Sequence, residues 1–163
     1  MSISHTIEKD YRLNLKLQSM MEIAVIESKL STCEKLKVGG ILTSNDFTIK
    51  SSGCNGAPSG YPHCKILNEP DNHSAIFEVH AENNLLSRCN WIPAQNESSY
   101  IFLTHLPCMS CAHIIVTNVN RLRIKKLYYN DVYIDNDSSY DKYRKPSSVV
   151  SFLKDSGIEV IKL

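Results

Sequence analysis

Two short motifs constrain the fold of this chain more than any other feature. They are HAE at residues 80–82 and PCMSC at residues 107–111. Zinc prefers sulfur and nitrogen ligands in tetrahedral geometry, and two thiolates in a C-x-x-C pattern at a helix start lie close enough to share one ion. The positive end of that helix stabilises their charge. We therefore expect a fold that brings His80, on one helix, to Cys108 and Cys111 on another.

The number of ligands indicates what such a site does. Three protein ligands leave one tetrahedral position open, which is typical of a catalytic site, and water there has a lowered pKa. Glu82 follows His80 by two residues, which places it beside the metal rather than on it. Its carboxylate can move protons between the water and a substrate. The alternative is a non-catalytic zinc-binding interaction module, a structural site that would have no use for Glu82.

The bulk properties narrow the class of protein. With 163 residues, the chain fits one domain that can bury an ordinary core. A formal net charge of +1 offers no broad basic field, so we expect no nucleic-acid partner. No apolar run is long enough to span a bilayer, and residues 1–10 lack the apolar core of a signal peptide. We therefore expect a cytoplasmic protein with reduced thiols, in which six cysteines indicate metal binding before disulfides.

Hydrophobic periodicity and turn residues predict alternating helices and strands. Residues 8–30 form a broad apolar helical face without Pro or Gly. Further helices are predicted at 78–88, 108–118 and 148–155, and strands at 37–43, 47–52, 100–104, 124–129 and 158–161. The alternation in the second half favours an α/β sheet covered by helices, and a hairpin of the first two strands makes that sheet mixed.

From about Ser28 to the C terminus, the sequence resembles the deoxycytidylate (dCMP) deaminases, in their phage and viral form. The resemblance rests on KVGGIL, CNGAPSGYPHC, VHAENNLL, THLPCMSCAHII and LYYNDVY, and on the H-x-E and P-C-x-x-C pair of nucleobase deaminases. The sequence departs from the family at Gly40, where Ala is usual. The resemblance implies one cytidine deaminase-like α/β domain over residues 1–163, with a mixed five-stranded sheet sandwiched between helices. An N-terminal helix at about 8–30 would precede a catalytic core at about 31–163.

The same resemblance implies the reaction and its setting. One catalytic zinc, held by His80, Cys108 and Cys111, would support hydrolytic deamination of dCMP to dUMP, with Glu82 moving the protons and dUMP feeding thymidylate synthesis. A bifunctional enzyme that also accepts dCTP is one alternative, and deamination of a base in polynucleotide or tRNA is another. Family members are commonly oligomers, so we expect a homo-oligomer, with a hexamer favoured. Many family members are regulated by dCTP and dTTP, whose phosphates can carry Mg²⁺, and the sequence alone does not decide whether this chain is among them.

The resemblance also assigns contacts to the base and the sugar. Asn55 is similar to the family residue that hydrogen-bonds the sugar and helps to close the pocket. The backbone N–H of Ala81 would contact the pyrimidine carbonyl, and the segment from Thr104 to Leu106 would line the pocket at the strand end, where α/β sheets generally place ligands. Tyr133 either packs on the substrate or is a core or interface residue.

Phosphate requires cationic or hydroxyl partners. Ser31, Lys35 and Lys37 precede the first strand and occupy the region that binds phosphate in the family. Each of them is equally suited to a solvated surface. The same basic segment suits a monophosphate or a triphosphate, so it does not choose between dCMP and dCTP.

A second, structural zinc is implied by the phage members of the family. Cys33, Cys64, His73 and Glu78 stand at or near the positions of its ligands, with His63 as a substitute for His73. Four such ligands would close the site and tie the long loop to two helices, so that metal binding adds folding free energy. The alternative is a set of ordinary polar loop residues and one buried cysteine.

Overall fold

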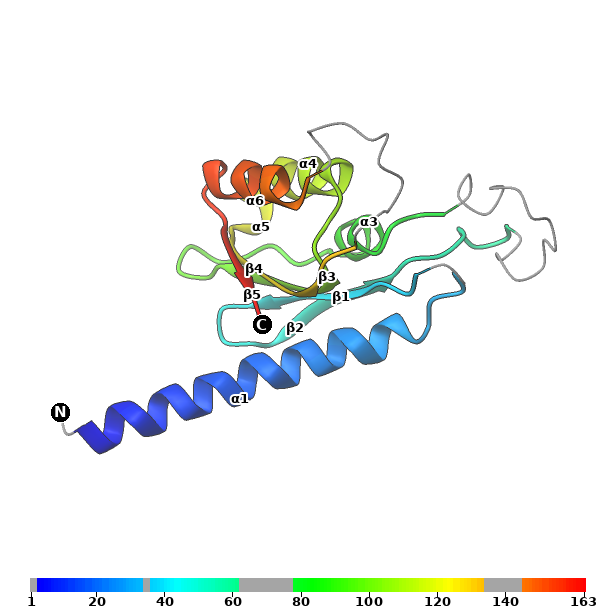
Figure 1. Cartoon of the computed structure of the whole chain (residues 1–163). Coiled ribbons are helices and arrows are strands. Elements are labelled where there is room, and N and C mark those ends of the chain that lie inside the picture. Colours follow the sequence, from blue (N-terminus) through cyan, green and yellow to red (C-terminus); the bar gives the residue numbers. More distant parts are fainter. Residues whose placement is uncertain (1–2, 34–35, 62–77, 134–144) are drawn as a thin grey trace.

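The structure is a computed structural model that describes residues 3–33, 36–61, 78–133 and 145–163 (Figure 1). Its helices and strands follow in the order α1 (Ile3–Ser28), β1 (Gly39–Ser44), β2 (Ile49–Cys54), α3 (Ala81–Ser87), β3 (Ser99–His105), α4 (Met109–Thr117), α5 (Val119–Leu122), β4 (Ile124–Asp131), α6 (Pro146–Asp155) and β5 (Glu159–Lys162). Among the described residues, no helix is long and apolar enough to cross a membrane.

The strands form one mixed sheet with the order β2-β1-β3-β4-β5. β1 and β2 make the antiparallel hairpin, and β1 also pairs antiparallel with β3. The pairs β3–β4 and β4–β5 are parallel. The expected mixed five-stranded sheet is therefore confirmed, and the parallel half carries the helical crossovers α4, α5 and α6.

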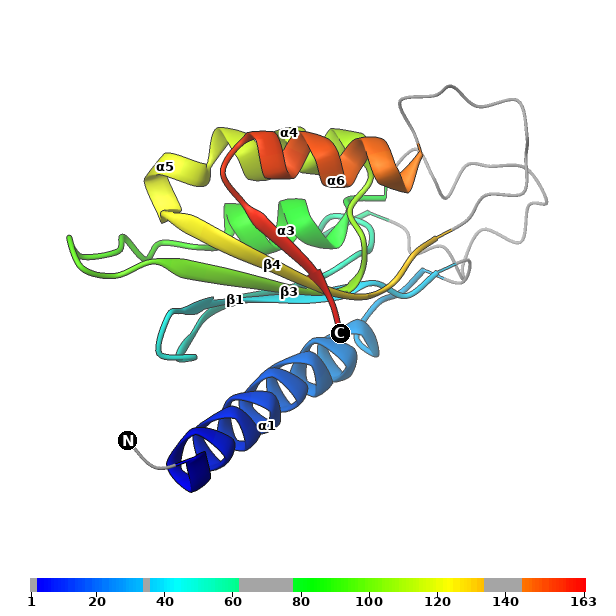
Figure 2. The same ribbon diagram turned by 60° about the vertical axis from the view of Figure 1, so that its left-hand side comes forward.

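Helices cover both faces of this sheet, with α1 on one side and α3, α4 and α6 on the other (Figures 1 and 2). In β3, Ile101 and Leu103 face the three-helix side, whereas Phe102 faces α1. This alternation is the two-residue period of a strand that is buried on both faces. The side chains of the three-helix core include Leu85, Ile115, Leu127 and Leu153. The smaller core under α1 contains Met21, Ala24, Ile41, Phe102 and Tyr128.

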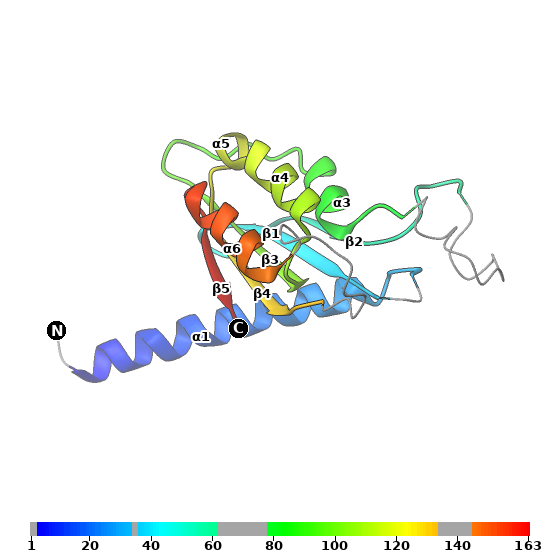
Figure 3. The same ribbon diagram turned by 45° about the horizontal axis from the view of Figure 1, so that its top comes forward.

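The N-terminal helix differs from its prediction in position and in burial. It begins at Ile3 rather than at residue 8 and ends at Ser28 rather than at residue 30. Only part of its predicted apolar face reaches the core, and the large apolar residues that stay exposed are Leu13, Leu15, Ile26 and Leu30. Leu15 and Ile26 lie on the side of α1 away from the buried Ala24, and Leu30 lies beyond the end of the helix. For Leu13 the reason is length: 26 residues of helix span about 39 Å, while the six residues of β1 span about 20 Å. The N-terminal half of α1 therefore runs past the sheet (Figure 3).

The other boundaries shift by a few residues. β1 and β2 each begin two residues later than predicted, at Gly39 and Ile49. α3 begins at Ala81, so Glu78 lies before the helix rather than in it. The short helix α5 was not expected from the sequence. These shifts leave the order of elements unchanged, but they decide which motif residues stand at helix ends.

Gly39 allows α1 to lie directly on β1. A Cβ atom at Gly39 would come within 2.3 Å of the Ala24 carbonyl oxygen and 2.4 Å of the Ser28 nitrogen, both backbone atoms of α1. A methyl group here can be accommodated only if the helix moves away from the sheet.

We therefore expect Gly39→Ala to lower the free energy of unfolding by about 3 kcal/mol, because overpacked cores strain the backbone. Urea denaturation followed by circular dichroism measures the change. The matched control is Gly40→Ala, whose Cβ would meet the flexible ends of the Leu103 and Leu85 side chains at 2.5 and 3.6 Å and the Phe102 carbonyl oxygen at 3.2 Å. Equal stability of the two variants would contradict the close approach of α1.

Candidate active site

Two helix N-termini meet at the site, and each presents a motif residue. His80 is the N-cap of α3 and Cys108 is the N-cap of α4, both with extended backbone angles. Neither side chain makes a capping hydrogen bond to its own helix. Pro107 precedes Cys108, where its fixed geometry suits the approach to a helix. The two side chains are therefore available to a shared ligand, at the positive ends of two helices.

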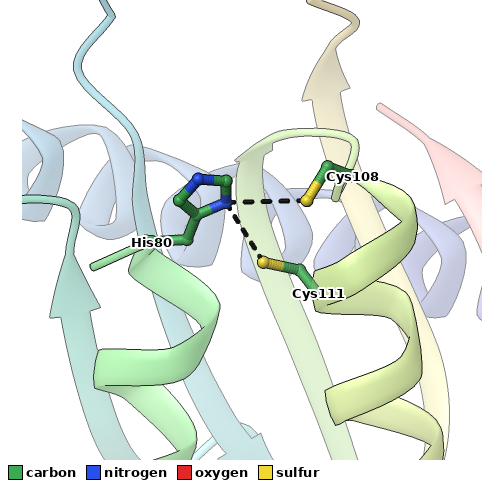
Figure 4. Close-up of side chains that lie close together, drawn as sticks. All are labelled: His80, Cys108 and Cys111. Carbon is green, nitrogen blue, oxygen red and sulfur yellow. Dashed lines mark hydrogen bonds between the residues drawn. The ribbon is translucent and has the colours of Figure 1, made fainter. Parts of the chain in front are cut away.

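The three predicted zinc ligands lie together (Figure 4). The Nδ1 atom of His80 is 3.6 Å from the Sγ of Cys108 and 3.3 Å from the Sγ of Cys111. All three donor atoms lie within 4.8 Å of one another. Zinc–sulfur bonds of about 2.3 Å and zinc–nitrogen bonds of about 2.0 Å in a tetrahedron place ligand atoms about 3.5–3.8 Å apart. The donor types and their spacing therefore fit one zinc ion.

Protons are shared among these three groups. A hydrogen bond from the Cys111 thiol lowers the pKa of Cys108 to about 4. The same hydrogen bond raises the pKa of Cys111. A separate hydrogen bond between His80 and Cys108 raises the pKa of His80 to about 9. The Cys108 thiolate thus faces two hydrogen-bond donors. Binding of a cation would replace those donors, as expected for a set of ligands that must be deprotonated to coordinate.

Glu82 lies in the first turn of α3, beside the donor set. Its side chain is buried, and burial raises the pKa of its carboxyl group. It also hydrogen-bonds the Cys111 thiol. A carboxyl group in this environment changes protonation more readily near neutral pH than an exposed one, which suits a group that accepts and returns protons.

Asn55 connects the segment before β1 to the segment before His80. Its Oδ1 accepts hydrogen bonds from the Ser31 hydroxyl at 2.7 Å and from the Val38 N–H at 2.8 Å. Its Nδ2 donates to the Leu36 carbonyl at 2.8 Å and to the Glu78 carboxylate at 2.5 Å. The buried amide thus uses its full hydrogen-bonding capacity within the protein. A sugar hydroxyl would have to replace one of these four bonds.

The residues expected to line the pocket lie in α3, at the end of β3, in the connection from β3 to α4 and after β4. Ala81 is fully buried and follows His80 directly. The Thr104 hydroxyl, near the carboxyl end of β3, accepts a hydrogen bond from the Gly39 N–H at 3.1 Å. Leu106 is buried in the connection from β3 to α4, and its N–H donates to the Asp131 carbonyl. Tyr133, after β4, is 43% exposed.

One neighbouring residue was not singled out from the sequence. His105 ends β3, with its Nδ1 3.1 Å from the Thr104 hydroxyl oxygen, and burial lowers its pKa. Asp131 lies opposite it on β4 and opposes that shift. The THLPC string contains His105, but only the parallel pairing of β3 with β4 shows its neighbour.

The second predicted metal site is only partly within the described residues. Cys33 is buried, and Glu78 accepts the hydrogen bond from Asn55. Cys64, His73, the substitute His63 and the phosphate candidate Lys35 lie outside the described residues. Within the part of the chain that the structure describes, His80, Cys108 and Cys111 form the one group of metal-binding side chains. Lys37 is exposed, and Ser31 is buried in its hydrogen bond to Asn55.

The amino-acid sequence of the chain is similar to those of known proteins. The chain is 27% identical to the deoxycytidylate deaminase of Enterobacteria phage T2, over 91% of this chain and 93% of the phage protein. It is 32% identical to ComE operon protein 2 of Bacillus subtilis over 63% of this chain, and it spans about half (52%) of that relative's length.

A solved structure extends the similarity to three dimensions. The dCMP deaminase from cyanophage S-TIM5, in complex with dCMP and dUMP, superimposes with a TM-score of 0.67 and 28% identity. The superposition covers 100% of this chain and 99% of the cyanophage chain. Residues 15–130 match the family model of the cytidine and deoxycytidylate deaminase zinc-binding region, a stretch that contains both motifs and most of the sheet. The chain therefore belongs to the cytidine and deoxycytidylate deaminase family.

Proposed function

We propose that this protein is a zinc-dependent dCMP deaminase that converts dCMP and water to dUMP and ammonia. The observation that carries the proposal is the donor set of His80, Cys108 and Cys111 with the buried carboxyl group of Glu82 beside it. Similarity to phage dCMP deaminases over nearly the whole chain supports the choice of substrate. We further propose that residues 1–163 act as one deaminase domain.

The chemistry requires a water molecule to add to C4 of cytosine. Zinc held by His80, Cys108 and Cys111 would supply a Lewis acid that makes the water more acidic. The Glu82 carboxylate accepts a proton from the attacking water and donates it to ring nitrogen N3. When the water oxygen has bonded to C4, Glu82 carries the second proton to the exocyclic amine, which leaves as ammonia. The products are therefore one uracil nucleotide and one ammonia per water consumed.

Positioning of the base and sugar is assigned to the residues around the site. The Ala81 N–H would hydrogen-bond the pyrimidine carbonyl, and Thr104 and Leu106 would form the pocket wall. Asn55 would contact the sugar by exchanging one of its internal hydrogen bonds. Tyr133 is exposed enough to pack on a ligand.

Phosphate would meet Ser31, Lys35 and Lys37. Of these, Ser31 already hydrogen-bonds Asn55, so the phosphate and sugar subsites would be joined through one hydroxyl. Acceptance of dCTP in addition to dCMP remains the alternative specificity, and a triphosphate would need more cations than a monophosphate. Regulation by dCTP and dTTP, with Mg²⁺, belongs to this proposal as well.

A second zinc on Cys33, Cys64, His73 and Glu78 is part of the proposal. Glu78 and Cys33 lie on segments that Asn55 and Ser31 connect, because the Cys33 N–H donates to the Ser31 hydroxyl. We also propose a homo-oligomer, with a hexamer favoured, and a cytoplasmic location. A reducing compartment keeps the thiolate ligands available.

The test of substrate is a direct comparison of three nucleotides. Zinc-loaded protein is incubated separately with deoxycytidine, dCMP and dCTP, and ammonia release and product identity are recorded. We expect turnover of dCMP without turnover of deoxycytidine, because the phosphate supplies binding energy that the nucleoside lacks. Turnover in the dCTP reaction would establish dual specificity. Absence of turnover in all three, with zinc bound and effector nucleotides present, would overturn the proposed function.

A further inference from the structure

Thr104 lies near the carboxyl end of β3, shortly before the chain enters α4 at Cys108 (Figure 4). Its side chain is buried. The carboxyl ends of parallel strands form the edge of the sheet where α/β proteins generally place their ligands, and β3 is parallel to β4. A hydroxyl group at this edge can face a bound nucleotide, so the direction of its proton affects what the site accepts.

The Thr104 hydroxyl has two partners that divide its hydrogen-bonding capacity. The Gly39 N–H can only donate, so it occupies one lone pair of Oγ1, at 3.1 Å. The second partner is the Nδ1 atom of His105, also at 3.1 Å. A buried hydroxyl proton needs an acceptor, and Nδ1 is the acceptor that the described residues bring to it. This network assigns the proton of the neutral imidazole to Nε2 and leaves Nδ1 unprotonated.

The surroundings of His105 keep its imidazole neutral. Burial lowers the pKa of His105 below the usual value of a histidine, and Asp131 on β4 opposes that shift only in part. Asp131 is the one charged group among the described residues that acts on this pKa. It lies opposite His105 in the register of β3 with β4, and its carboxylate accepts a hydrogen bond from the Val132 N–H. At neutral pH, Nδ1 can therefore accept the Thr104 proton.

These two hydrogen bonds determine what Thr104 can offer a ligand. Oγ1 donates its proton to His105 and accepts one from Gly39, so a single lone pair remains. In this state the hydroxyl accepts a further hydrogen bond but cannot donate one. It suits an N–H or O–H group of a nucleotide, such as the cytosine amino group or a sugar hydroxyl, and it does not suit a phosphate oxygen. Protonation of His105 would reverse this preference, because Nδ1–H would occupy the last lone pair and release the Thr104 proton.

We propose that His105 is a positioning residue of the deaminase site, whose Nδ1 atom accepts the Thr104 proton so that Thr104 presents only a lone pair to a hydrogen-bond donor of the substrate. His105 acts through Thr104 and is not one of the three metal donors. The inference rests on the proposed function for the identity of the substrate. The hydrogen bond between the two residues can be tested without any substrate.

The first test is the tautomer of His105 in the zinc-loaded full-length protein, by ¹⁵N NMR at neutral pH. The His105 signals are assigned by their loss in His105→Asn. We expect Nδ1 to be unprotonated and Nε2 protonated in wild type, and we expect the Nδ1 signal to move in Thr104→Val, which removes the hydroxyl but keeps the size of the side chain. Thr43→Val is the matched control, because the Thr43 hydroxyl is buried in β1 without a hydrogen-bond partner in the described part of the chain. It should leave the signal unchanged.

The second test is steady-state kinetics with dCMP. His105→Ala should raise KM roughly tenfold with little change in kcat, as expected when one hydrogen bond to the bound substrate is lost. Thr104→Val should raise KM by a similar factor, and the double variant should raise it no further, because the two residues act as one unit. His105→Asn should restore most of the affinity, because its Oδ1 can accept the Thr104 proton in place of Nδ1. Thr43→Val should keep the wild-type KM.

Dideoxycytidine monophosphate identifies the group that meets Thr104, because it lacks the sugar hydroxyl of dCMP but keeps the cytosine amino group. An equal loss with both substrates in Thr104→Val assigns the contact to the amino group, and a loss confined to dCMP assigns it to the sugar hydroxyl. A proton on Nδ1 in wild type, an unchanged KM in His105→Ala, or additive losses in the double variant would each overturn the proposal. Wild type that turns over no cytosine nucleotide would instead overturn the proposed function and with it the substrate contact, while the nitrogen signals would still decide the hydrogen bond.

Discussion

Replacement of Glu82 by Gln is expected to lower kcat for dCMP by roughly 10²–10⁴-fold, the usual contribution of a positioned general acid–base group. The amide keeps the size of the carboxyl group and hydrogen-bonds its neighbours, but it cannot accept a proton from water. Because Glu82 lies outside the three donors, the variant should retain zinc and its fold. Ammonia release, zinc analysis and thermal unfolding measure the three properties on the same sample.

The matched control for this change is Glu159→Gln, at an exposed position on β5. It removes only an exposed ion pair with Lys126, which is worth little. Its kcat should be that of wild type. Near wild-type turnover of the Glu82 variant would refute its role in proton transfer and would favour a zinc-binding interaction module, in which this carboxyl group has no task.

Cys108→Ala should abolish turnover and remove the catalytic zinc. The change deletes one of three donors, and the remaining imidazole and thiol bind zinc far more weakly. Because metal binding and folding are coupled, the variant should also unfold at lower temperature than the zinc-loaded wild type. Metal analysis of protein never exposed to chelator should give two zinc ions per wild-type chain and one per variant chain. A wild-type value of one would rule out the second site, and an unchanged value in the variant would contradict Cys108 as a ligand.

The control for this variant is Cys89→Ala. Cys89 is as buried as Cys111, but it packs in the hydrophobic core under α3 and α4 instead of facing His80. Its loss should cost some stability, as for any buried small side chain, without changing the zinc content. Loss of zinc in both variants would indicate a general collapse of the fold rather than removal of a ligand.

The sequence predicted the donor set because zinc chemistry limits which residues can serve. Few side chains bind this metal, so H-x-E and P-C-x-x-C named His80, Cys108 and Cys111 before any fold was known. The mixed sheet followed from alternating periodicities, and the structure confirms it. Helix ends were less predictable. Periodicity suggested a helix from residue 78, whereas α3 begins at Ala81 and leaves His80 as its N-cap, the position that turns the imidazole toward α4.

Contacts between distant segments were decided by the tertiary structure. The four hydrogen bonds of Asn55 join residues before β1 to Glu78, a convergence that no local pattern records. In the sequence, Gly39 is an ordinary strand glycine. In the structure, α1 crosses it so closely that a methyl group is excluded. The apolar pattern of α1 predicted a helix correctly, but not which residues would be buried, because burial depends on which side of the helix faces the sheet and on how far the sheet extends beneath it. Local sequence specifies which elements form and which atoms can bind a metal, while the lengths and crossings of packed elements determine what remains exposed.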